Sequence, residues 1–165
     1  MKLITSPSPI DTAIGSVTPS IFLAGSIEQD TAVDWQSAFV TAMSDIECTL
    51  FNPRRAEWDA TWTEDNPKFQ EQVSWELNAL DQADLIIMRF EPETKSPITL
   101  LELGLYASSG KLLVSCPPGF WRRGNVKIVC GRYGVPMYDE MSDLTVAVKA
   151  RLESKRMLRL IKAHR

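Results

Sequence analysis

Residues 83–90 read ADLIIMRF, and this stretch decides which class of fold the sequence predicts. Its apolar side chains follow one another almost without a break, whereas a strand with one face in water alternates apolar and polar residues. A short unbroken run is typical of a strand that is buried on both faces of a sheet. Such strands belong mostly to parallel sheets that helices cover on both sides.

Comparable apolar runs recur on either side of this strand. The sequence predicts further strands at residues 20–25, 46–52, 111–117 and 135–140. Longer amphipathic stretches lie between them and predict helices at residues 31–44, 67–82, 96–111 and 143–162. This alternation predicts a single doubly wound α/β domain of about five parallel strands, with helices on both faces.

The N-terminal residues set the expected domain boundary. Serines and prolines interrupt any hydrophobic run in residues 1–18, so we expect a flexible N-terminal extension and no signal peptide. The folded domain is then expected to span residues 19–165. No apolar run approaches the ~20 residues that a membrane-spanning helix requires. We therefore expect a soluble, cytoplasmic protein that does not bind membranes.

The composition argues against several classes of function. A chain of 165 residues with a net charge of −3 lacks the basic surface that nucleic-acid binding requires. Its three cysteines, Cys48, Cys116 and Cys130, form no CxxC pair, which argues against a disulfide framework or a zinc site. The single histidine, His164, lies next to the C-terminus, which argues against a catalytic triad. Acid–base chemistry is therefore expected from carboxylates, tyrosines or lysines, without a metal or organic cofactor.

Glu102 is unusual because it lies among leucines in SPITLLELGLYASSGK, residues 96–111. Ser96 is a suitable N-cap and Pro97 suits the first helical position, so a helix is predicted to start at Ile98. The apolar stripe of this helix is predicted to consist of Ile98, Leu101 and Leu105. Glu102 then lies beside or inside that stripe, either at the solvent boundary or as a functional carboxylate.

The predicted helix at residues 67–82 carries a second glutamate in a similar position. Its apolar face is predicted to consist of Phe69, Val73, Leu77 and Leu80. Glu76 falls on that face, three residues after Val73 and four before Leu80. Carboxylates are rarely buried unless they are paired or used, so two such residues favour a functional site. Each glutamate alone is equally consistent with a position at the boundary of its stripe.

Three segments together resemble the nucleoside 2-deoxyribosyltransferase-like family. They are IFLAGSIE (21–28), FQEQVSWELNALDQADLII (69–87) and SPITLLELGLYASSGK (96–111), in the family's order and spacing. The most specific part is the E-L-G-x-x-A pattern that begins at Glu102. The resemblance implies a flavodoxin-like fold and a homo-oligomer. The family's relatives include hydrolases that cleave the N-glycosidic bond of deoxynucleoside 5′-monophosphates.

The resemblance also implies a mechanism for the two glutamates. Glu102 would be the nucleophile that attacks C1′ of a 2′-deoxyribose and forms a covalent glycosyl ester. Glu76 matches the family's second acid, which assists protonation of the departing base. This chain has a glutamate there, where relatives often have an aspartate.

Further candidate residues follow from the resemblance. Phe22, Gly25 and Ser26 match a segment that borders the sugar and base, and the glycine permits close backbone approach. Ser96 matches the position that contacts the 5′ end of the nucleoside, which is a serine in the monophosphate hydrolases and tends to be a carboxylate in the transferases. Asn125 lies in the region that reaches a neighbouring subunit's site in the family's oligomers.

The sequence is consistent with several hypotheses about function. The resemblance favours transfer of 2-deoxyribose between nucleobases, with hydrolysis of (deoxy)nucleoside 5′-monophosphates as the alternative. A non-catalytic nucleotide-binding module is a third reading, and the two glutamates argue against it. The expected partners are a small-molecule nucleoside or nucleotide, a nucleobase and further copies of the chain. The loop with Trp58 and Trp62 either covers the base or packs locally.

The sequence lacks the motifs of other functions that occur in this fold class. No GxxxxGK[ST] loop or GxGxxG fingerprint is present, so nucleoside triphosphatase and dinucleotide readings have no support. A receiver domain would need acidic residues after the first strand, where this chain has Ala24, Gly25 and Ser26.

Overall fold

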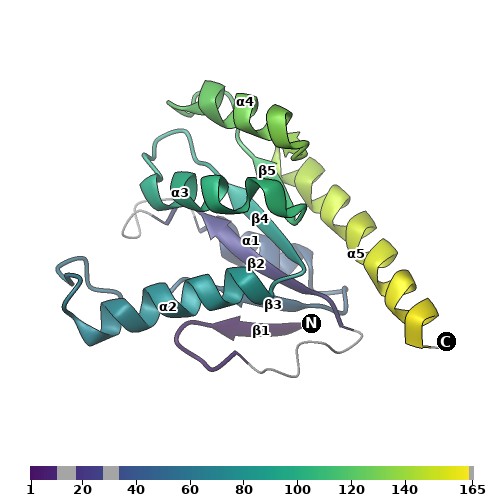
Figure 1. The fold of residues 1–165 in the computed structure, drawn as a ribbon, viewed down its shortest axis with the longest axis horizontal. Helices are drawn as coiled ribbons and strands as arrows, with labels where there is room; N and C mark the ends of the chain where they lie inside the picture. Colours follow the sequence, from purple (N-terminus) through teal and green to yellow (C-terminus); the bar gives the residue numbers. More distant parts are fainter. Residues whose placement is uncertain (11–17, 28–33, 164–165) are drawn as a thin grey trace.

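Six parallel strands form one sheet with helices on both faces (Figure 1). The computed structural model describes residues 1–10, 18–27 and 34–163. Its strands are β1 Lys2–Thr5, β2 Ser20–Gly25, β3 Thr49–Asn52, β4 Leu85–Arg89, β5 Leu112–Ser115 and β6 Met137–Tyr138. Its helices are α1 Trp35–Ala42, α2 Pro67–Gln82, α3 Pro97–Tyr106, α4 Arg123–Tyr133 and α5 Met141–Ala163, with a 3-10 turn, η2 Ala107–Ser109, after α3.

Different helices cover the two faces of the sheet, because successive side chains of a strand point to opposite sides. On β2, Phe22 and Ala24 belong to the apolar cluster that packs against α2, α3 and α4. Ile21 and Leu23 belong to the cluster that packs against α1 and α5. All four side chains are at most 1% exposed, as expected for a strand buried on both faces. The predicted doubly wound α/β fold is confirmed.

The strand order places the reversal point of the sheet between β2 and β4. Without β1, the order β3-β2-β4-β5-β6 is the flavodoxin-like one, in which the chain winds outward in both directions. β1 is a further parallel strand at the edge, where Lys2 pairs with Thr49 of β3. Ligands in such folds bind outside the carboxyl ends of the strands at the reversal point, which here are the ends of β2 and β4.

The N-terminal segment differs from the expected flexible extension of residues 1–18. Lys2–Thr5 form β1, and Trp75 of α2 donates a hydrogen bond to the Ser8 carbonyl over 2.7 Å. The expectation is therefore wrong for this part, while residues 11–17 lie outside the described part of the chain. An edge strand of four residues is held in place by hydrogen bonds to the neighbouring strand. The apolar pattern of so short a strand does not reveal this pairing.

The predicted buried face is wrong for α3 and only partly right for α2. In α3, Ile98, Leu101 and Leu105 are 56–59% exposed, whereas Glu102 is buried. In α2, Val73 and Leu77 are 36% and 42% exposed. The side chains that these helices bury are Gln72, Trp75, Ala79 and the predicted Leu80 of α2 and Thr99, Glu102 and Leu103 of α3.

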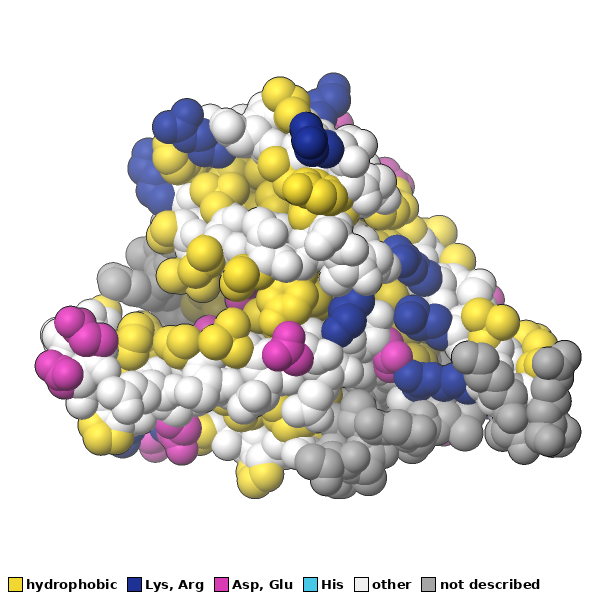
Figure 2. Space-filling model, in the orientation of Figure 1, with side chains coloured by type: hydrophobic (Ala, Val, Ile, Leu, Met, Phe, Trp, Pro, Cys, Tyr) yellow, Lys and Arg dark blue, Asp and Glu magenta, His cyan; other side chains and the backbone are white. Residues whose placement is uncertain are grey.

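This outward apolar surface is visible in the space-filling view, where hydrophobic side chains gather over α2 and α3 (Figure 2). We call Val73, Leu77, Ile98, Leu101 and Leu105 the α2/α3 apolar surface. Periodicity locates an apolar stripe on a helix, but it does not say whether the sheet or another molecule covers that stripe. The two glutamates therefore lie on faces turned toward the protein interior.

Candidate active site

Glu76 of α2 and Glu102 of α3 lie close enough for their charges to interact. Glu102 is 8% exposed, and burial is the main cause that raises its pKa to about 8. The negative charge of Glu76 raises the pKa of Glu102 further. Burial also raises the pKa of Glu76, and a hydrogen bond from Gln72 opposes that shift. Glu102 is therefore buried, whereas Glu76 is half-buried.

No cation balances this pair within the part of the chain that the structure describes. No described lysine or arginine forms an ion pair with either glutamate. Glu76 accepts one hydrogen bond, from Gln72 Nε2 over 2.8 Å, and no described group donates to Glu102. Two carboxyl groups that interact in a largely buried site resist double ionisation.

Aromatic side chains support the helix that carries Glu76. The rings of Phe22 and Trp75 are 6.5 Å apart, and Phe51 lies edge-on to the same tryptophan at 6.5 Å. Phe22 is 1% exposed, so its side chain belongs to the core. Its observed role is to pack beneath Trp75, the residue that precedes Glu76.

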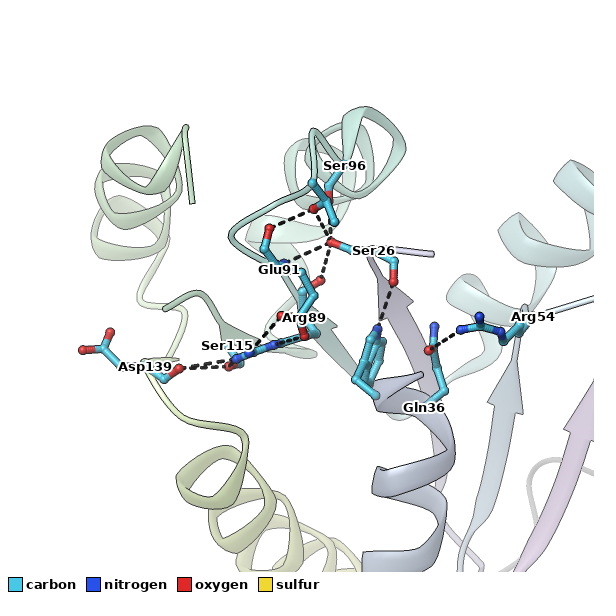
Figure 3. A network of polar contacts seen from close by, with 10 residues as sticks. Ser26, Gln36, Arg54, Arg89, Glu91, Ser96, Ser115 and Asp139 are labelled. Atoms are coloured by element: carbon cyan, nitrogen blue, oxygen red, sulfur yellow. Dashed lines mark hydrogen bonds and ion pairs between the residues drawn. The ribbon is translucent and has the colours of Figure 1, made fainter. Parts of the chain in front are cut away.

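Three buried hydroxyl groups meet where β2 and β4 end (Figure 3). Ser26 Oγ and Ser96 Oγ are hydrogen-bonded to each other, and Thr94 Oγ1 lies 2.9 Å from the first and 2.7 Å from the second. The Glu91 backbone N–H donates to Ser26 Oγ over 3.1 Å. The structure therefore brings together two predicted residues, Ser26 and Ser96, and adds Thr94.

Ser96 occupies the predicted N-cap position but does not cap the helix with its side chain. Its φ of 48° is in the left-handed region, which a serine rarely adopts. In this conformation its hydroxyl points toward Ser26 and Thr94 instead of the first turn of α3. Unusual backbone conformations of this kind cluster at functional sites.

Gly25 is required by the close approach of β2 to β4. Its φ of 149° is unfavourable for other residues. A Cβ atom at this position would lie 2.5 Å from the Arg89 carbonyl oxygen and 2.8 Å from Cζ2 of Trp35. The expected close approach at this glycine is present, and the neighbour is the protein's own backbone.

A charged network that the sequence did not reveal lies beside these hydroxyl groups (Figure 3). Arg89 at the end of β4 forms an ion pair with Glu91 over 2.8 Å and donates a hydrogen bond to Ser115 Oγ over 2.6 Å. Arg123 pairs with Asp139 over 2.6 Å. The positions of these residues in the sequence could have indicated the network, because polar residues that directly follow buried parallel strands meet at one edge of the sheet.

The two remaining candidates lie elsewhere. Asn125 is exposed in the first turn of α4, and no described hydrogen bond joins it to the two glutamates. Trp58 and Trp62 pack against each other with ring centroids 5.2 Å apart, and Arg55 lies over the Trp62 ring at 5.5 Å. This arrangement favours the local-packing alternative for the loop.

Comparison with known proteins identifies the family. Residues 18–120 match the model of a family described as nucleoside 2-deoxyribosyltransferase like. The chain belongs to this family. Family membership indicates an enzyme of glycosyl-transfer or N-glycosidase type that acts on nucleosides or nucleotides. The matched region contains every candidate residue except Asn125.

A solved structure supports the fold of this family member. The crystal structure of a conserved protein from Enterococcus faecalis V583 is similar, with a TM-score of 0.61 and 13% sequence identity. The similarity covers 81% of this chain and 99% of that chain. At this identity the likeness concerns the fold alone. No curated protein sequence matches the chain significantly.

Neither a metal site nor a membrane span was found in the described residues. Within residues 1–10, 18–27 and 34–163, no three His, Cys, Asp or Glu side chains are grouped to hold a metal ion. None of the helices in the same ranges has the length and apolarity to cross a membrane. A cavity of about 290 Å³ lies against α4 and β6, and neither glutamate lines it.

Proposed function

We propose that the protein transfers 2-deoxyribose from one nucleobase to another through a covalent intermediate on Glu102. The observation that carries this proposal is the Glu76–Glu102 pair, in which a half-buried and a buried carboxyl group interact and neither has a described cation as its ion-pair partner. Carboxyl groups whose pKa values are raised by burial and by a neighbouring acid cluster at catalytic sites, where acid and nucleophile need different protonation states. The family to which the chain belongs supplies the reaction class.

The proposed reaction has two displacement steps at C1′ of the sugar. In the first, an ionised Glu102 oxygen bonds to C1′ as the C1′–N bond breaks, and the base leaves with the bonding electron pair. Protonated Glu76 donates its proton to the departing base. In the second, a nitrogen of the incoming base bonds to C1′, and the ester bond breaks to restore the Glu102 carboxylate. The incoming base returns a proton to Glu76, so configuration at C1′ is retained overall.

We infer that the pair shares one proton near neutral pH, which suits this mechanism. A nucleophile must be ionised and a general acid must be protonated at the same time. Two coupled carboxyl groups provide these two states together. The steps need no metal or organic cofactor, so a chelator is expected to leave the rate unchanged.

Hydrolysis of a nucleoside 5′-monophosphate is the second candidate. The hydroxyl cluster of Ser26, Thr94 and Ser96 favours it, because hydroxyl donors at the start of α3 suit a phosphate group. The same hydroxyl groups can bind a free 5′-OH. We therefore propose that this cluster holds the 5′ end of the substrate in either reaction.

A comparison of substrates tests both candidates. A deoxynucleoside and its 5′-monophosphate are each incubated with and without an acceptor base, and the products are separated by chromatography. Base exchange on the unphosphorylated nucleoside supports transfer. Free deoxyribose phosphate formed in the presence of abundant acceptor overturns transfer in favour of hydrolysis. Binding of either compound without any reaction points to the non-catalytic module.

We also propose a cytoplasmic homo-oligomer in which a second copy covers the α2/α3 apolar surface. The side chains of this surface flank both glutamates in sequence and are 36–59% exposed. A contiguous exposed apolar surface is unusual for a monomer. In such an assembly Asn125 of one copy contacts the substrate of the other. Leu101→Glu is expected to give monomers in sedimentation experiments, whereas Val146→Glu on exposed α5 is not. A monomeric wild-type protein contradicts this proposal.

A further inference from the structure

Gln72 is a buried polar side chain that the proposed reaction does not use. It lies on α2 one turn before Glu76 and is 3% exposed. Its amide Nε2 donates hydrogen bonds to the Pro53 carbonyl over 2.8 Å and to Glu76 Oε1 over 2.8 Å. Its Oε1 accepts a hydrogen bond from Ser6 Oγ over 2.5 Å. Three contacts from separate parts of the chain thus fix one side chain.

The orientation of this amide follows from its partners. The Pro53 carbonyl can only accept a hydrogen bond, so the NH₂ group of Gln72 must face it. The second hydrogen of the same NH₂ group then faces Glu76. In the reverse orientation, the amide oxygen would face both a carbonyl and a carboxyl oxygen, and these acceptors repel one another. The Ser6 hydroxyl donates to the amide oxygen and reinforces the observed orientation.

A fixed donor affects the two forms of Glu76 differently. A hydrogen bond donated to a carboxyl group stabilises its ionised form more than its neutral form. Glu102 receives no such bond from any described residue. Since the pair resists double ionisation, stabilising the charge on Glu76 leaves the shared proton on Glu102.

We propose that Gln72 is a positioning residue that places the pair's proton on Glu102 in the ligand-free protein, and that Ser6 holds Gln72 in the orientation this requires. The contact ties the acid–base state of the site to β1, because Ser6 follows that strand directly. Substrate binding must then move the proton from Glu102 toward Glu76 before reaction begins. Only this last consequence rests on the proposed function.

No lysine or arginine of the described residues forms an ion pair with Glu76 or Glu102 or is among the causes that shift their pKa values. Glu76 lies on α2, and Glu102 and Tyr106 lie on α3. Burial, Asp81 and Glu102 together raise the pKa of the Tyr106 phenol to about 12, so this group stays neutral in the pH range in which the two glutamates titrate. Gln72 is therefore the described neighbour that distinguishes one carboxyl group from the other.

Site-resolved titration tests the proposal without substrate. The side-chain carboxyl carbons are labelled with ¹³C in the full chain and followed by NMR, with Glu76→Gln and Glu102→Gln variants to assign the signals. In the wild type, Glu76 is expected to ionise at lower pH than Glu102. Gln72→Met has a similar shape but donates no hydrogen bond, so it is expected to shift Glu76 to higher pH and Glu102 to lower pH.

A matched control lies on the same helix. Gln70 is exposed and donates to the Glu64 carbonyl over 2.7 Å, away from the pair, so Gln70→Met is expected to leave both curves unchanged. Unchanged curves in a folded Gln72→Met variant overturn the proposal. If that variant does not fold, Ser6→Ala decides: a smaller shift in the same directions upholds the proposal, and wild-type curves overturn it.

This test separates the inference from the proposed function. A protein that cleaves no nucleoside, yet shows the shift in Gln72→Met, refutes the proposed function and upholds the placement of the proton. A protein that exchanges bases, yet shows no shift, upholds the function and refutes the role of Gln72.

Discussion

Two groups of charged residues in this protein differ in how their charge is balanced. Arg89 and Glu91 lie 2.8 Å apart with side chains 13% and 15% exposed, so each charge has an opposite partner. Glu76 and Glu102 are also largely buried, but both are acids, and no described cation lies between them. A balanced pair is typical of structural support, whereas an unbalanced pair destabilises the fold and is expected where the carboxyl groups are used.

The largest expected effect comes from removing one acid of the unbalanced pair. Glu102→Gln has nearly the same shape but cannot form the glycosyl ester, so base release is expected to fall by at least about a thousandfold. The measurement is chromatography of the released base. Exposed Glu93→Gln, in the loop before α3, serves as the control and should keep wild-type activity. Undiminished turnover in a folded Glu102→Gln variant would contradict the assignment of Glu102 as the nucleophile.

The same substitution is expected to change how stability depends on pH. The pKa of Glu102 rises from 4.5, the ordinary value that applies in the unfolded chain, to about 8 in the folded protein. Between these values the folded state binds more protons than the unfolded state. The free energy of unfolding therefore falls as pH rises from about 4.5 to about 8, and the stabilising contribution of the protonated form is fully present only below this window.

Glu102→Gln removes this titration. Relative to the wild type, the variant is expected to gain stability between pH 5 and pH 8, on the order of a few kcal/mol. Urea denaturation at several pH values measures the free energy of unfolding. The buried amide of the variant has its own free-energy cost, which does not depend on pH. The decisive quantity is therefore how steeply the free energy of unfolding changes with pH in the variant and in the wild type. Parallel curves for the two proteins would contradict the raised pKa.

Breaking the balanced pair is expected to affect stability instead of chemistry. Arg89→Met leaves Glu91 largely buried without its cation, which should lower the free energy of unfolding by about 3 kcal/mol. Chemical denaturation measures this loss, and the double variant Arg89→Met/Glu91→Gln should recover part of it. An unchanged denaturation midpoint in Arg89→Met would show that the pair is not a structural support.

The smallest effect is expected at the outer edge of the same network. Asp139 pairs with Arg123 over 2.6 Å, but its side chain is 51% exposed. Water screens such a pair, so Asp139→Asn should lower the free energy of unfolding by less than about 1 kcal/mol. A loss as large as that of Arg89→Met would mean that exposure does not separate the two pairs.

The sequence by itself determined the parallel fold and the two central helical segments. β2 and α2 have the bounds that were predicted, residues 20–25 and 67–82, because a continuous apolar run and a proline at the helix start are local signals. Glu76 and Glu102 were found as candidates from their apolar neighbours and from the family pattern. Local patterns reveal these features because the residues that produce them are adjacent along the chain.

Only the tertiary structure decided which helix faces are buried and which polar groups meet. β1 was missed because a short edge strand depends on pairing with β3. The exposed stripe of α3 carries the apolar pattern that was expected to face the core, because a stripe can be covered by another molecule as well as by the sheet. Ser6 and Gln72 are separated by 66 positions in the sequence, and their contact exists because β1 and α2 are packed side by side. No periodicity within either element encodes such a contact.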